Sequence, residues 1–540
     1  MRSTVLLLIW SVLILSCHGW AAGQTFDERF EDWPTALKIQ GRLLVASELE
    51  DLQWLQDLLP SAELGEACLL IDGDQQAEHV SRVYQTHFQT LVHCSIERLE
   101  ELQSDRAPQI IAWHLEPTAD NLADASDVRR IAASLAAHLS YGGTVVMTGA
   151  AAALAGKFFW TAESPAGSPS EGTQLLPDCV LELGYAPSQS KRLLQQISRQ
   201  RRCVGIGLEP DTLLLLDGRR LQVAGAGRAW LMLPAGAGLP SRVETLAPRA
   251  GRRHSVTHWL ADLTEWRRDA IDRTLEPFPP TQPQPPLVAQ GTLVIVGGGG
   301  MPPGLMHRFM ELAGGPESAR LVYIPCAEEE QVAPRASMIE DWQALGVQHT
   351  SLLHTKDRQQ ANTDQSFLAP LEDATGIWFG GGRQWNLADS YYGTTAHRLM
   401  KRVLQRGGVI GGSSAGASIQ ARYLARATPI ENYRLMAPGY ERGGLGFISG
   451  VAIDQHFSQR RRQPDMSQLV QRYPQLLGIG IDEATALIVQ GSRAEITGQG
   501  AVFFYDAWAP QQPPETDYLK VTAGHNYDLI ERRVVSHPSE

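Results

Sequence analysis

One segment of this 540-residue chain occurs twice, and this internal repeat constrains the fold more than any other feature. Trp113 and the run Asn121 to Asp124 recur as Trp378 and the run Asn386 to Asp389, at a constant offset of 265 residues. The same register carries Tyr141-Gly142-Gly143 onto Arg406-Gly407-Gly408. A later block repeats at nearly the same offset: Gly205-Ile206-Gly207, Thr212, Arg220, Gly225 and Gly227 against Gly478-Ile479-Gly480, Thr485, Arg493, Gly498 and Gly500. Because both blocks keep their order, the sequence predicts a tandem duplication of one domain.

The pattern of apolar segments indicates the class of that domain. Short apolar runs alternate with longer amphipathic stretches, and the clearest runs are Leu43 to Ala46, Leu293 to Val296, Leu321 to Ile324 and Gly408 to Ile410. This alternation is typical of an α/β fold with a mostly parallel sheet flanked by helices. A single hydrophobic core stops growing at about 250 to 300 residues, so a chain of this length exceeds one core. The sequence therefore predicts two tandem α/β domains.

The expected boundary between the domains is a proline-rich linker, residues 275–290. Its prolines are too dense for a helix or a central strand. They are Pro277, Pro279, Pro280, Pro283, Pro285 and Pro286. The first domain then covers residues 27–274, and the second covers residues 291–540.

The N-terminus resembles an export signal. Arg2 precedes an apolar run from Val5 to Leu15, and small residues follow at Ala21 to Gly23. The run is too short to cross a bilayer as a helix. We therefore expect a signal peptide at residues 1–23 and a secreted or periplasmic protein. Cys17, behind Leu15 and Ser16, leaves a lipoprotein anchored to the membrane as the alternative.

Cysteine spacing and charge exclude some functions. Five cysteines follow Cys17 at wide spacing without a Cys-x-x-Cys pair, so no zinc site is predicted. One or two disulfides in the first half would fit an oxidising compartment. Cys326, behind the apolar run Leu321 to Ile324, is expected to be a buried, inert thiol. Forty-seven basic against 59 acidic residues give a net charge of -12, which disfavours nucleic acid as a partner.

The most informative stretch places a serine between glycines, in Gly412-Ser413-Ser414-Ala415-Gly416. A Gly-x-Ser-x-Gly turn between a strand and a helix forces the serine into a strained elbow, with its oxygen exposed at the carboxyl end of the strand. The glycines let the turn tighten. The amide that follows, that of Ala415, can donate to a developing negative charge. We expect a helix through residues 418–425 and a nucleophile at Ser414.

A serine hydroxyl needs a base within hydrogen-bond reach. His456 ends the strand-like run Ile453-Asp454-Gln455, and parallel sheets collect functional groups at strand ends. Asp482 and Glu483 follow another apolar stretch, and the residues alone leave open which of them orients the histidine. The chain order serine, histidine, acid disfavours α/β-hydrolases, which run serine, acid, histidine. A class I glutamine amidotransferase would normally carry cysteine in the elbow.

Four separated motifs resemble serine peptidase family S51, which includes cyanophycinase and aspartyl dipeptidase. They are Gly412-Ser413-Ser414-Ala415-Gly416-Ala417, Gly444-Leu445-Gly446-Phe447, Asp454-Gln455-His456-Phe457 and Gly480-Ile481-Asp482-Glu483. The similarity covers about residues 291–506. It implies a flavodoxin-like, class I amidotransferase-like α/β fold. It also implies a triad of Ser414 as nucleophile, His456 as base and Glu483 as the acid that holds the imidazole.

Two further glycine-rich turns accompany the elbow. In the turn from Phe379 to Gln384, the resemblance implies that the amide of Gly382 completes the oxyanion hole with Ala415, and that Gln384 contacts substrate. The turn from Gly297 to Gly304 has neither the Gly-x-Gly-x-x-Gly spacing nor the Lys-Ser/Thr pair of a phosphate loop. We expect it to form a wall of the pocket, and we predict no cofactor.

The resemblance also suggests a substrate. Cyanophycinases cleave a polyaspartate backbone that carries arginine on each side-chain carboxyl, and they release β-aspartyl-arginine dipeptides. By resemblance, Asp454, Gln455, Arg460 and Arg462 bind such a peptide polymer, since a guanidinium suits a carboxylate. The alternative for the arginines is a solvated run of charge.

Two positions depart from the family pattern. Asp465 stands where a third arginine is expected, and Arg383 replaces the acidic residue before Gln384. These departures leave the exact substrate open. The alternatives are a dipeptidase that acts after aspartate on short peptides and a binding module without catalysis.

The first half lacks the corresponding chemistry. In the repeat register Gly149 and Pro210 stand where the second half has its serine and acid, and the histidine falls near Tyr185. None of these residues can take the role of its counterpart in the triad. We therefore expect residues 27–274 to be an inactive copy, kept for packing, for pairing with the second domain or for substrate capture. A homodimer is left open.

Overall fold

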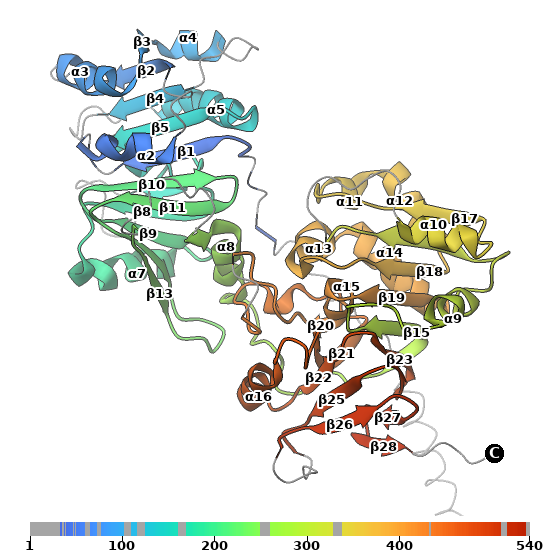
Figure 1. Ribbon diagram of the computed structural model, residues 1–540. Coiled ribbons are helices and arrows are strands. Elements are labelled where there is room, and N and C mark those ends of the chain that lie inside the picture. Colours follow the sequence, from blue (N-terminus) through green and yellow to red (C-terminus); the bar gives the residue numbers. More distant parts are fainter. Residues whose placement is uncertain are drawn as a thin grey trace, which may run out of the picture. The chain divides into compact units, whose positions relative to one another are not determined.

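The computed structural model describes residues 33–535, except for 35–36, 38, 47, 49, 60–64, 73–76, 102–109, 116–124, 160–168, 249–259, 328–336, 431–433 and 509–515. The expected signal peptide, Cys17 and the repeat run Asn121 to Asp124 lie outside the described residues. The described residues form four sheets with helices around them, two sheets in each half of the chain (Figure 1). The predicted α/β class is confirmed.

The first half is built on an eight-stranded sheet in the order β14-β11-β10-β1-β5-β4-β2-β3. Strands β1 to β5 run parallel to their neighbours, and β10, β11 and β14 continue the sheet antiparallel beside β1. The bounds are β1 (Arg42–Ala46), β2 (Glu66–Asp72), β3 (Thr90–His93), β4 (Ile110–Leu115), β5 (Thr144–Gly149), β10 (Thr212–Asp217), β11 (Arg220–Gly225) and β14 (Ala261–Asp262). Strand β4 is buried along its whole length, which is typical of a parallel strand covered on both faces.

A second, six-stranded sheet of the first half has the order β13-β12-β9-β8-β6-β7. Strands β6, β8 and β9 are parallel, and β12 and β13 follow antiparallel. The bounds are β6 (Phe158–Phe159), β7 (Ser170–Glu171), β8 (Cys179–Leu183), β9 (Val204–Leu208), β12 (Ala229–Leu233) and β13 (Arg242–Leu246).

The second half begins with a nine-stranded sheet in the order β17-β16-β18-β19-β15-β23-β24-β27-β28. The first five are parallel to their neighbours, and the rest are antiparallel. The bounds are β15 (Val288–Val296), β16 (Arg320–Ile324), β17 (His349–Leu352), β18 (Gly376–Phe379), β19 (Val409–Ser413), β23 (Thr485–Gly491), β24 (Arg493–Gly498), β27 (Asn526–Asp528) and β28 (Arg533–Val535).

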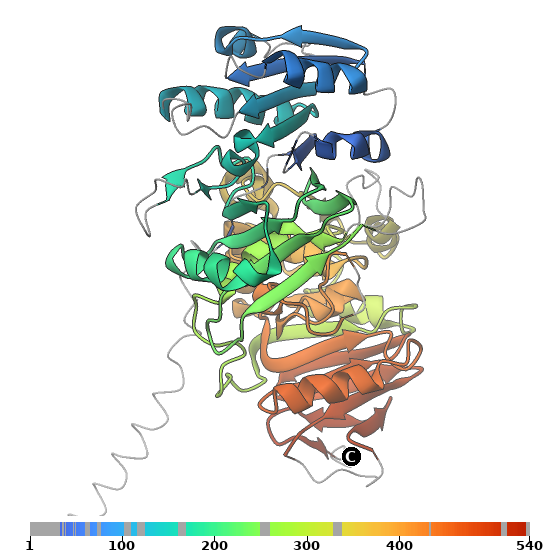
Figure 2. The ribbon, with the colours of Figure 1, turned by 90° about the vertical axis from the view of Figure 1, so that its left-hand side faces the viewer.

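The last sheet has five strands in the order β20-β21-β22-β25-β26. Strands β20, β21 and β22 are parallel, and β25 and β26 are antiparallel. The bounds are β20 (Ala421–Tyr423), β21 (Ile448–Gln455), β22 (Leu477–Ile481), β25 (Ala501–Tyr505) and β26 (Leu519–Thr522). Helix α16 (Gln463–Arg472) packs Met466 and Leu469 against this sheet, as the orange helix in front of the orange strands in Figure 2.

The two halves repeat one topology. Strands β3, β2, β4, β5, β1, β10, β11 and β14 occupy the same places as β17, β16, β18, β19, β15, β23, β24 and β27, with the same directions. In the smaller sheets β6, β8, β9, β12 and β13 match β20, β21, β22, β25 and β26. Only edge strands β7 and β28 of the described residues lack a counterpart.

Helices cover both faces of each large sheet. In the second half, alternate residues of β15 divide between two cores: Leu293 and Ile295 face one side, while Val294 and Val296 pack with Phe309 on the other. The helices of the first half are α2 (Leu55–Leu58), α3 (Ala77–His87), α4 (Ile96–Glu101), α5 (Ala125–Ser140), α6 (Ala150–Leu154), α7 (Ser190–Arg199) and α8 (Leu263–Asp272). Those of the second are α9 (Leu305–Leu312), α10 (Ser337–Ala344), α11 (Gln360–Thr363), α12 (Gln365–Glu372), α13 (Gln384–Tyr391), α14 (Thr395–Gln405), α15 (Ala415–Ser418) and α16. The 3-10 helices of the described residues are η1 (Glu50–Trp54), η4 (Pro187–Gln189) and η5 (Glu441–Gly443).

Local differences from the sequence predictions have physical reasons. The helix expected through residues 418–425 is wrong: α15 ends at Ser418, and β20 follows because its backbone pairs with β21. Strand β15 starts at Val288, inside the expected linker, since the last proline of that segment is Pro286.

The cysteines divide into one bonded pair and three free thiols among the described residues. Cys68 on β2 forms a disulfide with Cys94, which follows the neighbouring strand β3, and their Cα atoms are 6.0 Å apart. Cys326 is buried, as expected, and its thiol donates to the carbonyl of Thr355. Burial raises the pKa of this thiol.

Candidate active site

The elbow at Ser414 is a strained turn that only glycines on both sides permit. Buried strand β19 ends at Ser413, and Ser414 then adopts φ 57° and ψ -113° before α15 begins. A Cβ atom on Gly412 would lie 2.3 Å from the carbonyl oxygen of Gly416, and one on Gly416 would lie 2.2 Å from the carbonyl oxygen of Phe379, so neither glycine can carry a side chain without a shift of the backbone. Positive φ is unfavourable for serine, and such strain collects at functional sites. Ser414 remains partly exposed.

Three side chains from different strand ends form one hydrogen-bonded chain. Ser414 Oγ lies 2.9 Å from His456 Nε2, and His456 Nδ1 lies 2.6 Å from Glu483 Oε1. They follow β19, β21 and β22, respectively. Because a carboxylate can only accept, Nδ1 carries the proton and donates to Glu483, which leaves Nε2 to accept from the serine hydroxyl. This tautomer is the one that a general base requires.

The glycine turn behind β15 connects the three strand ends. Three successive carbonyl groups at the end of this strand accept backbone N–H groups from the segments of the serine, the histidine and the acid. The nitrogen to oxygen distances are 3.0 Å for Ser414 to Val296, 2.8 Å for His456 to Gly297 and 2.8 Å for Ala484 to Gly298. The turn therefore sets the relative positions of the three side chains through the backbone.

The same turn also touches the histidine and the acid directly. A Cβ atom on Gly298 would lie 2.4 Å from Cε1 of His456, and one on Gly299 would lie 2.4 Å from the carboxyl carbon of Glu483. Both glycines have positive φ, at 90° and 66°. Sequence reasoning expected a pocket wall here and missed that the turn packs against two of the three triad candidates. The run of four glycines was the available signal.

Burial and nearby charges act on the imidazole together. Burial lowers the pKa of His456, and the Glu483 carboxylate opposes this effect through its hydrogen bond. The guanidinium groups of Arg460 and Arg462 lower the pKa further. A neutral imidazole at neutral pH is the form that can accept a proton from a hydroxyl.

A second glycine turn lies beside the serine. It follows β18, and a Cβ atom on Gly381 would lie 3.5 Å from Cβ of Ser414 and 4.0 Å from its hydroxyl oxygen. Gly382 is exposed, with φ 131°. In the described part of the chain, no backbone hydrogen bond engages the amide nitrogens of Gly382 and Ala415. Such amides can stabilise an oxyanion beside a nucleophile.

Comparison with known proteins identifies the family of this chain. The model of peptidase family S51 matches residues 293–497. A cyanophycinase of Geminocystis herdmanii (strain PCC 6308) is 31% identical over 224 residues, which make up 41% of this chain and 79% of that protein. The chain belongs to peptidase family S51.

Other proteins are similar to parts of this S51 peptidase. A cyanophycinase of Synechococcus elongatus is 27% identical over 237 residues, 43% of this chain and 70% of that protein. The crystal structure of a peptidase from an acI-B1 Actinobacterium aligns with 45% of this chain and 98% of its own, at 24% identity and a TM-score of 0.34. Family membership makes the chain a serine-type, cyanophycinase-like peptidase.

The structure distinguishes the two acids that follow β22 in this S51 peptidase. Glu483 reaches the imidazole, whereas Asp482 turns the other way. Its Oδ1 accepts from the amide and the hydroxyl of Ser458, and its Oδ2 accepts from the amide of Ala501. Asp482 thus holds the segment that follows the histidine, and Glu483 alone is placed to orient the ring.

The predicted substrate residues near the histidine differ in exposure. Asp454 is fully buried and accepts from Arg426 at 2.8 Å and from Arg462 at 2.9 Å. Arg462 also donates to the side chain of Gln455. These contacts leave Asp454, Gln455 and Arg462 buried in an ionic network, whereas Arg460 is exposed.

Asp465, at the position where the family pattern has arginine, extends this network. Its carboxylate accepts from Arg426 at 2.5 Å. The departure thus adds a second acidic partner to a buried guanidinium. Arg383, the other departure, is exposed at the start of α13.

Gln384 has no access to solvent in this conformation. Its side-chain nitrogen donates to the carbonyl groups of Ala425 and Arg426, both at 2.8 Å. The residue therefore ties the start of α13 to the segment after β20. Its predicted contact with substrate stays a prediction.

The first half keeps the elbow of the S51 peptidase without its side chains. Gly149 ends β5 with φ 63° and ψ -142°, and these backbone angles are similar to those of Ser414. Gly184 follows β8 and also has a positive φ. The amide of the next residue, Tyr185, donates to the carbonyl of Leu208. In the second half, the amide of Phe457, the residue after His456, donates to the carbonyl of Ile481 in the same way. Pro210 follows β9 as Glu483 follows β22. Glycine, glycine and proline thus stand at the three positions.

Two kinds of feature are absent from the described residues. No group of three or more histidine, cysteine, aspartate or glutamate side chains in this part of the chain could hold a metal ion. No described helix has the length and apolar character needed to cross a bilayer.

Proposed function

We propose that this S51 peptidase hydrolyses a β-aspartyl-arginine polymer of the cyanophycin type, with Ser414 as its nucleophile. The observation that carries this proposal is the hydrogen-bonded chain from Ser414 Oγ through His456 to Glu483, beside two amides without backbone partners. The relatives named cyanophycinase support the substrate class.

The proposed reaction passes through an acyl-enzyme. Ser414 Oγ attacks the scissile carbonyl carbon while His456 Nε2 takes the hydroxyl proton, and Glu483 stabilises the resulting imidazolium. The amides of Gly382 and Ala415 donate to the oxyanion. The intermediate collapses, the C–N bond breaks and His456 gives its proton to the leaving amine. A water molecule then gives a proton to His456 Nε2 and attacks the ester carbon. The ester C–O bond breaks, His456 returns the proton to Ser414 Oγ, and the acid product leaves.

Exposed Arg460 supports recognition of a carboxylate next to the scissile bond. Its backbone N–H donates to the carbonyl of His456 at 3.0 Å, and its charge lowers the pKa of the imidazole, so the residue lies close to the reacting groups. A guanidinium can bind a substrate carboxylate through two parallel hydrogen bonds. Arg462, Asp454 and Gln455 form a buried network that joins the residues before His456 to the residues after it.

A fluorophosphonate probe tests the nucleophile. We expect the full-length protein to be labelled once per chain, and we expect Ser414→Ala to abolish both labelling and hydrolysis. Ser413→Ala removes the neighbouring serine and is the matched control, which should keep both. Labelling that survives Ser414→Ala would contradict the proposal.

Insoluble cyanophycin granules test the substrate. A granule suspension should clear and yield β-aspartyl-arginine dipeptides. Turbidity that never falls, combined with cleavage of short aspartyl peptides, would favour a dipeptidase. Binding to granules without any probe labelling would favour a module that binds but does not cleave.

We further propose that the protein is exported, by a signal peptide at residues 1–23 or as a lipoprotein at Cys17. The disulfide between Cys68 and Cys94 supports this proposal, because such bonds persist in oxidising compartments. N-terminal sequencing of the mature protein distinguishes the routes: a start after Gly23 indicates a signal peptide, and a lipid-blocked Cys17 indicates a lipoprotein. A mature chain that still begins at Met1 would contradict export.

We also propose that residues 27–274 arose as a copy of the catalytic domain at residues 291–540, joined to it by the linker 275–290. The matching strand orders of the two halves support a duplication, and so do the corresponding positive-φ positions at Gly149 and Ser414. Without a serine, histidine and acid, the first copy can contribute only indirectly to hydrolysis.

A further inference from the structure

Asp389, near the end of α13, is held by two arginines of the first half. Arg219, in the turn between β10 and β11, donates to its Oδ2 at 2.5 Å, and Arg268 of α8 donates to its Oδ1 at 2.9 Å. The hydroxyl of Tyr440 donates to the same carboxylate at 2.9 Å. Arg268 and Tyr440 are buried, and their side chains stack with 3.9 Å between the guanidinium carbon and the ring centroid.

Further contacts keep these arginines in place. Arg219 donates to both carboxylate oxygens of Asp262, at 2.5 and 2.9 Å, and its guanidinium lies over the ring of Trp385 on α13. A Cβ atom on Gly439 would lie 2.5 Å from the carbonyl oxygen of Glu265, so the backbone of the second half approaches α8 closely. We call Arg219 and Arg268 the clamp on Asp389. The first half holds this clamp in place through its own contacts.

Helix α13 links this clamp to the candidate oxyanion hole. Its N-cap is Arg383, the residue directly after Gly382. The amide of Arg383 donates to the carbonyl of Ala327 at 2.7 Å, which fixes the path of the glycine turn. The helix also packs against α15, whose first residue is Ala415. One short helix thus contacts both segments that supply the proposed oxyanion donors.

We propose that the first half serves as a positioning module, in which Arg219 and Arg268 hold α13 through Asp389 and so place the amides of Gly382 and Ala415. This inference rests on the proposed function, because it assumes that those amides receive the oxyanion. Arg219 and Arg268 touch neither substrate nor reacting atoms, so they are positioning residues.

The size of the expected effect follows from geometry. A displacement of about 1 Å in a catalytic group can cost on the order of 100-fold in rate. Loss of one oxyanion donor costs roughly 100- to 1,000-fold in turnover. A loosened α13 displaces the donors without removing them, so we expect Arg219→Ala and Arg268→Ala each to lower kcat about 10-fold. KM should change much less, since the arginines make no contact with the substrate.

The experiment uses the full-length protein. It measures kcat and KM together with the rate of fluorophosphonate labelling, for both variants at a temperature where circular dichroism shows folded protein. The matched control is Asp272→Asn, which removes an ion pair between α8 and Arg442 but no contact with α13. It should keep kcat and the labelling rate.

Two further variants separate positioning from a general loss of structure. Arg268→Lys keeps the charge and should recover part of the labelling rate. With Asp389→Asn as background, Arg268→Ala should cause little further loss, because the two residues act through one contact.

The two proposals fail in different ways. Wild-type protein that is never labelled would refute the proposed function itself. Wild-type protein that is labelled at Ser414, with folded Arg219→Ala and Arg268→Ala variants labelled equally fast, would overturn the positioning role alone. Equal losses of kcat in Asp272→Asn and the arginine variants would overturn it as well.

Discussion

At the scale of single residues, the protonation of His456 decides whether Ser414 can be activated. The imidazole must be neutral to accept the hydroxyl proton, so activity is present above its pKa and is lost as the pH falls through it. Burial and the charges of Arg460 and Arg462 lower this pKa, against the effect of Glu483. The ordinary value is about 6.5. We therefore expect kcat/KM to hold its value at neutral pH and to fall only below about pH 6.5.

Substitution of Arg460 tests the electrostatic part of this argument. Arg460→Ala removes a charge that lowers the pKa of His456, so the acid limb of kcat/KM should move to higher pH. The control is Arg461→Ala, which removes the exposed charge of the next residue. An unmoved limb in Arg460→Ala, or an equal shift in the control, would contradict the expected local effect.

Some residue placements could be predicted from sequence and others could not. The serine, histidine and acid candidates were found because each follows an apolar stretch, and parallel strands end at a common edge. The choice between Asp482 and Glu483 needed the structure, since adjacent residues after a strand point in different directions. The burial of Arg462 and Gln384 could not be predicted from the sequence either. Arg462 pairs with Asp454, and Gln384 donates to carbonyl groups after β20, and both contacts depend on tertiary packing.

At the scale of elements, the glycine turn after β15 holds the triad candidates together. Gly298→Ala would place a methyl group 2.4 Å from the present position of the His456 ring, and the ring must leave its hydrogen-bonding position beside Ser414 to avoid it. We expect a loss in kcat on the order of 100-fold. The positive φ of Gly298 adds a strain of roughly 1–2 kcal/mol for alanine.

Gly407 provides the matched control for this variant. It has φ 87° against 90° at Gly298, but a Cβ atom there would meet nothing within 4 Å. Gly407→Ala should therefore lose similar stability and keep its kcat. Measurement of the melting temperature and of kcat for both variants separates strain from collision. Equal kcat values in the two variants would mean that the turn does not position the histidine.

Element order was easier to predict than element boundaries. The alternation of apolar and amphipathic stretches identified the α/β class, and the two halves that share the repeat at an offset of 265 residues have matching strand orders. The error at residues 418–425 arose because the alanines around β20 favour a helix locally. Pairing with β21 outweighs that preference in the folded chain.

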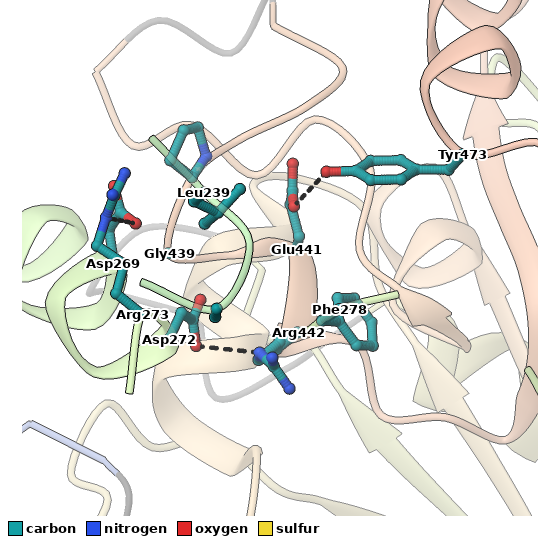
Figure 3. A pocket seen from close by; sticks show the side chains of 11 residues that line it. Leu239, Asp269, Asp272, Arg273, Phe278, Gly439, Glu441, Arg442 and Tyr473 are labelled. Carbon is teal, nitrogen blue, oxygen red and sulfur yellow. Dashed lines mark hydrogen bonds and ion pairs between the residues drawn. The ribbon is translucent and has the colours of Figure 1, made fainter. Parts of the chain in front are cut away.

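At the scale of the whole molecule, elements from both halves line one pocket (Figure 3). Asp272 of α8 forms an ion pair with Arg442, and Glu441 accepts hydrogen bonds from the hydroxyl groups of Tyr423 and Tyr473. Burial raises the pKa of Asp272 to about 6 and that of Glu441 to about 7. The contact between the halves therefore contains two carboxyl groups whose pKa values are raised above the ordinary range.

These raised values predict how stability changes with pH. A carboxyl group with a folded-state pKa above its unfolded value of about 4.3 binds more protons in the folded protein. Its contribution to the stability of the folded protein is complete below the unfolded-state pKa. The contribution is lost as the pH rises through the folded-state pKa, which is about 7 for Glu441. Glu441→Gln stays neutral and keeps an acceptor for a tyrosine hydroxyl. The melting temperature of the wild type should therefore fall relative to that of Glu441→Gln between about pH 5 and pH 8.

Glu340→Gln, at an exposed glutamate of α10, should follow the wild type throughout. Parallel melting curves for the wild type and Glu441→Gln would show that this carboxyl group does not couple proton binding to folding.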